Sequence, residues 1–232
     1  MIGTPRVHHR LTDSTNERAK ELADAGAAHG TLVTACEQSA GRGRQGRAWT
    51  APAESAVLMS LILRDLDERH ALLPLAAAVA VCEACEREAS ATAQCAVKWP
   101  NDVWIDRRKV AGILIEGRPQ EGWAVVGIGI NVTTDSFPTE LADIATSLQL
   151  AGYDTTTATV LAELLAALER WISAPPAAVL AAWRSRDALK GERVRWADGE
   201  GVADGIDDSG ALRVQTRNGP VTLDAGEVHL LR

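Results

Sequence analysis

The sequence has 232 residues, of which 46% are hydrophobic and 24% are charged, so it can bury a full core and is not disordered throughout. Its formal net charge of −7 argues against nucleic acid as the main partner, because neutralisation of phosphates dominates such binding. No apolar run reaches the roughly 18 residues of a membrane span, and residues 1–10 lack the apolar core of a secretory signal, so we expect a cytoplasmic protein without a membrane partner.

The first predicted helix covers residues 13–26. Ser14 and Glu17 stand at the spacing of a capping box, apolar residues follow on one face, and Gly26 ends the pattern. Capping uses only part of the polar groups in this segment, so Ser14, Thr15 and Asn16 are also candidates to bind the polar head of a ligand. A predicted strand follows at residues 31–36.

The segment 41–49, GRGRQGRAW, alternates glycine with arginine. Glycine lets backbone N–H groups approach a ligand closely, and the guanidinium groups of Arg42, Arg44 and Arg47 match the oxygens of phosphates and carboxylates. We therefore predict a loop that folds over a polyanion such as a nucleoside triphosphate. A solvated basic loop is the alternative, and for Trp49 a place in the core competes with stacking on a ligand.

The same loop fits the G-x-G-x-x-G fingerprint of dinucleotide-binding proteins through Gly41, Gly43 and Gly46. That fingerprint requires a following helix, whereas this chain continues through Pro52 into a second predicted strand at residues 56–63. The signature residues of protein kinases and the P-loop motif are both absent from the sequence. Sequence context therefore excludes these three modes of nucleotide binding.

The predicted helix 72–89 has Pro74 in its first turn and carries Cys82 and Cys85 one turn apart. A zinc site would need a second pair of ligands at similar spacing, and Cys36 and Cys95 are isolated in the sequence. We interpret Cys82 and Cys85 as small buried hydrophobic residues in a reducing compartment and predict no protein-held metal.

The next predicted strand, residues 95–100, leads into the sequence KWPND. Lys98 lies at the end of a strand that we expect to be buried, where an unpaired charge is costly and requires an anion. That anion is either a ligand or the acidic partner of a structural ion pair. Asn101 and Asp102 follow with the composition of a β-turn.

Two further strands are predicted at residues 109–116 and 123–132. In the second, Gly127 and Gly129 alternate and therefore share one face. Because glycine weakens a strand, the pair indicates the close approach of a flat apolar ligand or of a helix packed on the sheet.

Helices are predicted at residues 157–172 and, beginning at the Pro175–Pro176 break, at 175–189. Residues up to about 187 are thus expected to form one domain of helices around a central sheet. Beyond Leu189, short β runs are separated by DG, DSG and NG, which predicts a small antiparallel barrel.

Four motifs in this order resemble the biotin protein ligase family: STN at 14–16, EQSAGRGRQGRAW at 37–49, KWPND with KVAGILIE between 98 and 116, and GIGINV at 127–132. The resemblance implies an α+β fold in which helices flank a mixed central sheet, as in class II aminoacyl-tRNA synthetases, followed by a small SH3-like β-barrel. It implies a catalytic domain over residues 1–187 and a C-terminal β domain over residues 188–232.

The resemblance also implies a two-step reaction with ATP, biotin and Mg²⁺. The carboxylate of biotin attacks the α-phosphate of ATP, giving biotinyl-5′-AMP and pyrophosphate; a lysine of a biotin carboxyl carrier domain then takes the biotinyl group and releases AMP. Some members carry an N-terminal DNA-binding domain. Because the motifs begin close to Met1, we expect the type without one, as a monomer or a weak homodimer.

By position, the resemblance implies the following roles. The biotin site is expected to contain Ser14, Thr15, Asn16, Gln38, Gly41, Arg42, Gly43, Arg44, Lys98, Gly127 and Gly129. The nucleotide is expected to contact Arg44, Arg47, Trp49, Lys109 and Asn131. Lys98, placed at the biotin carboxyl and the α-phosphate, forms the catalytic group with Arg42 and Arg44. The base for the acceptor lysine is not identified, with Asp102 as one candidate, and Glu17 stands where many relatives carry glutamine.

Two other functions remain open at this point. A lipoate ligase of the related fold would be distinguished by competition between biotin and lipoate, although the GRGRQGR loop favours biotin. A non-catalytic regulator that binds biotin or nucleotide would carry an additional DNA-binding or partner domain, and none is visible in the sequence.

Overall fold

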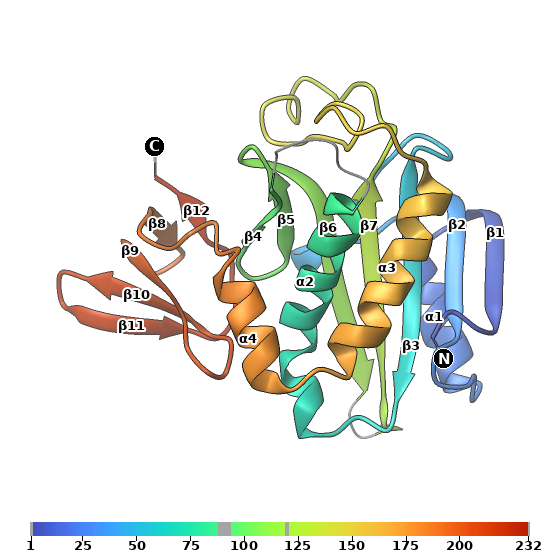
Figure 1. The fold of residues 1–232 in the computed structure, drawn as a ribbon, viewed down its shortest axis with the longest axis horizontal. Coiled ribbons are helices and arrows are strands. Elements are labelled where there is room, and N and C mark those ends of the chain that lie inside the picture. Colours follow the sequence, from blue (N-terminus) through green and yellow to red (C-terminus); the bar gives the residue numbers. More distant parts are fainter. Residues whose placement is uncertain (1, 88–93, 119–120, 232) are drawn as a thin grey trace.

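Two sheets organise the chain, and the computed structural model describes residues 2–87, 94–118 and 121–231 (Figure 1). The larger sheet has seven strands in the order β1-β2-β3-β7-β6-β5-β4, and the smaller has five in the order β11-β10-β9-β8-β12. β1 is parallel to β2, whereas the other neighbouring strands are antiparallel. The predicted α+β class, with helices around a mixed sheet and a small antiparallel β unit after it, is confirmed. The boundary at residues 187 and 188 stays a prediction.

The larger sheet consists of β1 (Arg6–Thr12), β2 (Leu32–Gln38), β3 (Ala56–Arg64), β4 (Ala96–Lys98), β5 (Asp102–Ile105), β6 (Arg108–Arg118) and β7 (Trp123–Asn131). The smaller sheet consists of β8 (Arg193–Trp196), β9 (Gly199–Ile206), β10 (Leu212–Thr216), β11 (Gly219–Leu223) and β12 (His229–Leu230). The α-helices are α1 (Thr15–Asp24), α2 (Leu73–Glu86), α3 (Thr157–Ile172) and α4 (Pro176–Arg184), and 3₁₀ turns cover Arg44–Gly46 and Glu68–Leu72.

Each predicted helix and strand is present, although several end earlier than expected. The predicted helix 72–89 ends at Glu86 as α2, and residues 88 and 89 lie outside the described residues. The predicted helix 175–189 ends at Arg184 as α4. Two strands were not predicted: β1 is polar at most positions because it forms an edge of the sheet, and β5 has only four residues.

The capping box predicted at the start of α1 is wrong. Ser14 has the extended backbone of an N-cap residue, but its side chain makes no capping hydrogen bond. The Glu17 carboxylate turns away from the helix terminus and pairs with Lys20, at 2.8 Å, and with Arg42. Glu17 is therefore engaged by a loop residue, a tertiary contact that helix periodicity does not reveal. Gly26 follows the helix at φ +87°, as expected for a stop.

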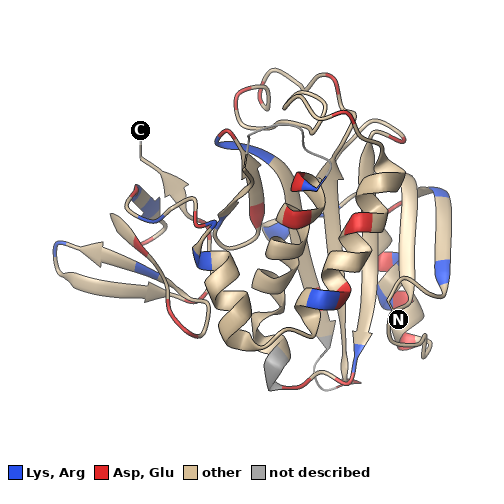
Figure 2. Ribbon diagram, viewed as in Figure 1, with Lys and Arg blue, Asp and Glu red and all other residues tan. Residues whose placement is uncertain are grey.

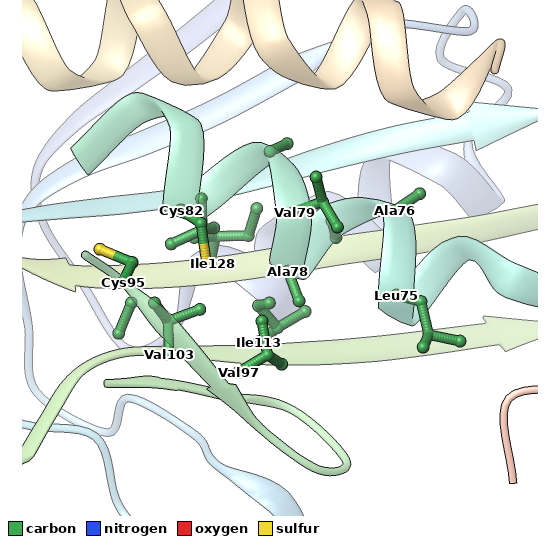
Figure 3. Packing of buried hydrophobic residues seen from close by; sticks show 14 of the residues in the cluster. Leu75, Ala76, Ala78, Val79, Cys82, Cys95, Val97, Val103, Ile113 and Ile128 are labelled. Carbon is green, nitrogen blue, oxygen red and sulfur yellow. The ribbon is translucent and has the colours of Figure 1, made fainter. Parts of the chain in front are cut away.

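The main core lies between the larger sheet and the helices α2 and α3, which cover the same face (Figure 1). Every position of α2 from Leu75 to Cys82 is buried, and its many alanines bring the helix close to the sheet. Figure 3 shows Ala78, Val79 and Cys82 of this helix packed with Val103 and Ile128 of the strands beneath. Within the described residues, no helix is long and apolar enough to cross a membrane.

Cys95 is not isolated, contrary to the expectation from sequence. Its thiol lies within hydrogen-bonding range of the Cys82 and Cys85 thiols, and all three side chains are at most 2% exposed (Figure 3). Burial raises the pKa of the Cys82 thiol well above its usual value, and a hydrogen bond with Cys95 together with burial does the same for Cys85. The interpretation of Cys82 and Cys85 as buried hydrophobic residues is confirmed.

Candidate functional site

A cavity of about 240 Å³ lies on the face of the larger sheet opposite α2. Ile128 and Ile130 point from β7 into the core beneath α2, so the alternating residues Gly127 and Gly129 face the other way, into this cavity. The start of α1, the arginine–glycine loop and β6 provide the other walls. The cavity brings together every candidate site residue except Gly41 and Lys98: Ser14, Thr15, Asn16, Gln38, Arg42, Gly43, Arg44, Arg47, Trp49, Lys109, Gly127, Gly129 and Asn131.

The loop over the cavity is a closed hairpin. The N–H of Trp49 donates to the carbonyl of Gly41 at 2.9 Å, and the N–H of Gly43 donates to the carbonyl of Arg47 at 2.7 Å. Gly41 lies at the base of this hairpin, where a Cβ would overlap the Trp49 carbonyl and lie 2.7 Å from Nε2 of Gln38. Gly41 therefore shapes the loop without lining the cavity, and binding of a polyanion by the loop stays a prediction.

One end of the cavity is a buried network of polar side chains. Oε1 of Gln38 accepts hydrogen bonds from the backbone N–H (2.7 Å) and the hydroxyl (3.1 Å) of Thr15. The hydroxyl of Ser60 lies 2.5 Å from Oδ1 of Asn16 and 2.8 Å from Oγ1 of Thr15. Nδ2 of Asn16 donates to Glu116 at 2.9 Å. These contacts fix the amide and hydroxyl groups before any ligand arrives.

Sequence reasoning missed two members of this network. Ser60 is a single hydroxyl in the apolar run AVLMSLIL, and this residue is completely buried. Glu116 closes the run KVAGILIE and also pairs with Lys20 at 3.2 Å. A lone polar residue within an otherwise buried strand is a usable signal, because such a group must find a partner.

Replacing Ser60 with alanine is expected to lower the free energy of unfolding by about 1–3 kcal/mol, because Oδ1 of Asn16 loses a buried hydrogen-bond donor. The same change should weaken binding of the ligand that uses Asn16. Chemical denaturation and ligand titration measure the two effects. The exposed Ser136 serves as the control: its replacement with alanine should change neither quantity, and an equal effect there would contradict the assignment.

Two side chains of the protein pack against the face of β7 that carries Gly127 and Gly129. A Cβ on Gly127 would overlap Oδ1 of Asn16 and lie 2.7 Å from its Cγ. A Cβ on Gly129 would lie 2.5 Å from Cε2 of Trp49, and one on Gly112 would lie 3.0 Å from Cζ3 of the same indole. The close approach predicted at these glycines is thus made by side chains of the protein, Asn16 at one end and Trp49 at the other, and contact with a flat ligand stays a prediction.

Positive charge gathers at the Trp49 end. Nζ of Lys109 lies 5.5 Å from the centre of the Trp49 ring and 2.6 Å from a carboxylate oxygen of Asp102. Arg44 is half-buried, and the loss of solvation lowers the pKa of its guanidinium from the ordinary value. Nη1 of Arg44 lies 3.4 Å from Oδ1 of Asn101, a long contact that leaves most of its hydrogen-bonding capacity for a ligand.

Lys98 lies in a smaller cavity that shares Arg44, Arg47 and Asn101 with the main one, so the two adjoin. Burial lowers the pKa of the Lys98 ammonium; the Asp102 carboxylate opposes this effect, and the positive charge of Lys109 adds to it. Lys98 therefore belongs to the cation cluster, as expected, but the lysine on the wall of the main cavity is Lys109.

The smaller sheet also reaches this region. Glu227, just before β12, forms an ion pair with Arg47 and lies 3.7 Å from Nε2 of His229. Gly226, Glu227 and Val228 line the smaller cavity with Lys98. Sequence reasoning missed Glu227, and no local pattern could have found it, because only the tertiary fold brings it to Arg47.

The cavity has the β7 glycines on its floor, a fixed polar network at one end and a cluster of cations at the other. This arrangement suits an elongated ligand whose charged part is anionic. The chain belongs to the biotin protein ligase family: residues 8–133 match the model of the Biotin/lipoate A/B protein ligase family, and residues 191–231 match the Biotin protein ligase C terminal domain. The family assignment made from the four motifs is confirmed.

Similarity to individual proteins extends over nearly the whole chain. The chain is 37% identical to the bifunctional ligase/repressor BirA of Bacillus subtilis, over 99% of this chain and 75% of that protein. It is 36% identical to the biotin–[acetyl-CoA-carboxylase] ligase of Mycobacterium tuberculosis, over 95% of this chain and 87% of that protein. The structure of biotin protein ligase from Aquifex aeolicus in complex with biotin and ATP superimposes with a TM-score of 0.85 at 29% identity, covering 99% of each chain.

Proposed function

We propose that this chain is an ATP-dependent biotin protein ligase, which converts biotin and ATP to biotinyl-5′-AMP and transfers the biotinyl group to a lysine of a biotin carboxyl carrier domain. The observation that carries the proposal is the cation cluster of Arg44, Arg47, Lys98 and Lys109 around the two adjoining cavities. Forming an acyl-adenylate brings a carboxylate against a phosphate, and fixed positive charge stabilises the additional negative charge of the transition state. Family membership supports the same reaction.

In the proposed binding mode, the head of biotin contacts the polar network of Thr15, Asn16 and Gln38. The rings lie in the cavity between Asn16 and Trp49, which cover the β7 glycines, so the carboxylate points toward Lys109. The α-phosphate of ATP meets the carboxylate there, and the two outer phosphates extend toward Arg47, which lines both cavities and leads to Lys98. This mode exchanges the roles expected for the two lysines: Lys109 acts at the reacting atoms, and Lys98 binds the departing pyrophosphate.

Mg²⁺ is proposed to accompany the triphosphate. Magnesium is usually held by one or two carboxylates together with substrate phosphates. Asp102 offers one carboxylate beside the cation cluster, and within the described residues no group of three or more His, Cys, Asp or Glu side chains could hold a metal by itself. The ion would thus be held mainly by the substrate phosphates, with Asp102, which pairs with Lys109, as the nearby carboxylate, and it would neutralise phosphate charge when bound.

The second step requires the acceptor lysine to lose a proton, because its reference pKa is about 10.4. Asp102 fits poorly as that base, since its carboxylate already pairs with Lys109 at 2.6 Å. The carrier domain, the absence of a nucleic-acid partner, the cytoplasmic location and the monomeric or weakly dimeric state stay predictions.

One assay tests the proposal. The protein is mixed with ATP, labelled biotin and a biotin carboxyl carrier domain, and label on the carrier is measured together with AMP. Transfer of label from biotin, undiminished by excess lipoate, is expected. Transfer from lipoate alone would favour the lipoate ligase, and binding of biotin without turnover would favour the non-catalytic regulator.

Replacing Arg42 with alanine is expected to release biotinyl-adenylate into solution. Arg42 joins the loop to α1 and β6 through Glu17 and, at 3.5 Å, Glu116, so its loss should loosen the hairpin that excludes water from the mixed anhydride. Filtration of single-turnover mixtures measures free adenylate. The prediction fails if adenylate retention and biotin affinity both equal those of the unaltered protein.

A further inference from the structure

A cysteine and a histidine lie side by side at the β1 edge of the larger sheet, outside the cavity. Sγ of Cys36 on β2 is 3.4 Å from Nε2 of His8 on β1, and Nδ1 of His8 is 2.9 Å from Oγ1 of Thr34. His8 is exposed and Cys36 is half-buried. The chain has four cysteines, all of them described, and the other three are buried in the core, so Cys36 is the thiol that small molecules can reach.

The neighbours of His8 suit it to take a proton from this thiol. Nε of Arg6 donates to Oγ1 of Thr34 at 3.1 Å, and the remaining lone pair of that oxygen can accept the Nδ1–H of His8. Nε2 is then free to accept the proton of Cys36. After the transfer, the imidazolium donates to Thr34 on one side and to the thiolate on the other. A nucleophile, a base and an orienting group are thus in contact.

The surface around this pair is basic. Arg6, His8 and Arg10 alternate along β1 and therefore project from the same face, and all three are exposed. The register pairs His9 with Ala35 and Leu11 with Glu37, which places Arg10 beside Cys36. Figure 2 shows basic positions along β1 at the edge of the sheet. A surface with several cations attracts small anions.

We propose that Cys36 and His8 form a thiol-modification site that reacts with small anionic disulfides. His8 takes the proton from Cys36, and the thiolate attacks one sulfur of the disulfide. The disulfide bond breaks, a mixed disulfide forms on Cys36, and the other half leaves as a thiolate that takes up the proton from His8. The incoming disulfide is the oxidant, so the step needs no further reagent. Neither Cys36 nor β1 lines the proposed biotin site, so the inference goes beyond the proposed function.

Reaction of the folded protein with 5,5′-dithiobis(2-nitrobenzoate), an anionic disulfide, tests the pair. One fast equivalent of released thiolate is expected, with the other cysteines reacting only after unfolding. Cys36→Ser should remove the fast phase, and His8→Gln should slow it about 100-fold, the lower end of what a positioned base contributes. Should His8→Gln unfold the protein, all remaining thiols would react, and His8→Asn replaces it. A fast phase that survives Cys36→Ser, or equal rates with and without His8, overturns the proposal.

Comparison with 2,2′-dithiodipyridine, a neutral disulfide, tests whether the exposed basic residues along β1 (Arg6, His8 and Arg10) favour anionic disulfides. Arg10→Gln and added salt should slow the anionic reagent several-fold more than the neutral one. Arg213→Gln, at another exposed β-strand position, is the matched control and should leave both rates unchanged. Incubation with oxidised glutathione followed by peptide mass analysis should place the adduct on Cys36. Equal sensitivity of both reagents to Arg10→Gln, or an adduct on another cysteine, overturns the assignment.

Discussion

Replacing Lys109 with methionine is expected to slow biotin-dependent release of pyrophosphate by about 10²–10³-fold, the effect of removing one preorganised electrostatic contact from a transition state. Lys109 lines the main cavity beside Trp49, where the carboxylate and the α-phosphate are proposed to meet. Biotin affinity should change far less, since the polar network at the other end is untouched. Pyrophosphate release under saturating substrates, with biotin titration alongside, measures the two effects.

The variant Lys98→Met distinguishes the proposed role of Lys109 from that of Lys98. Lys98 lies in the adjoining cavity, so its loss should mainly raise the KM for ATP, by about tenfold for one lost phosphate contact worth about 1.4 kcal/mol. The opposite pattern, with turnover abolished in Lys98→Met and retained in Lys109→Met, would restore the role that the family resemblance implied for Lys98. Lys190→Met, at an exposed position, controls for loss of charge alone.

Adding one methyl group at Gly127 is expected to weaken biotin binding by about 100-fold, equivalent to about 2.7 kcal/mol. The new Cβ would overlap the Asn16 amide, which Ser60 and Glu116 hold from two sides, so Asn16 must leave its place. Overpacking of this kind also lowers the free energy of unfolding by about 1–3 kcal/mol. Calorimetric titration with biotin and thermal unfolding measure the two consequences.

Gly129→Ala should mainly weaken binding of the other ligand, ATP. Its Cβ would displace Trp49, so ATP binding should fall more than biotin binding. Gly117→Ala on β6, outside the cavity, is a matched control for crowding by a methyl group on a sheet glycine, because its Cβ would also meet a close neighbour, the Trp123 carbonyl at 3.2 Å, but no side chain of the cavity. If Gly127→Ala and Gly129→Ala impair both ligands equally, the two ends of the cavity do not have separate roles.

Local sequence predicted those parts of the site that depend on backbone chemistry. Alternating glycine and arginine indicated a loop that folds over a polyanion; residues 41–49 form a hairpin over the cavity, and binding of an anion there stays a prediction. Gly127 and Gly129 indicated close approach to one face of a strand, which is observed. Apolar residues that recur at helical spacing also predicted each α-helix, because burying one face of a helix requires such a repeat.

Contacts between distant segments could not be predicted in the same way. Ser14 and Glu17 have capping-box spacing, yet Glu17 pairs with Arg42, which a local pattern cannot register. Cys95 was isolated in the sequence and adjacent to Cys82 in the core. Which cavity each of the two lysines lines, Lys109 the main one and Lys98 the smaller one, is likewise a property of the assembled sheet and not of either motif.

The ion pair between Arg47 and Glu227 has a consequence for the order in which the protein matures. Arg47 emerges early in synthesis, whereas its carboxylate partner comes from the segment just before β12, after every strand of the larger sheet has been made. A nascent chain that has folded only its first sheet therefore exposes an arginine without its counter-charge. The counter-charge of Arg47 is therefore supplied only once the segment before β12 has folded, and because β12 pairs with β8, a circular permutation that separates these two strands should disturb the ion pair.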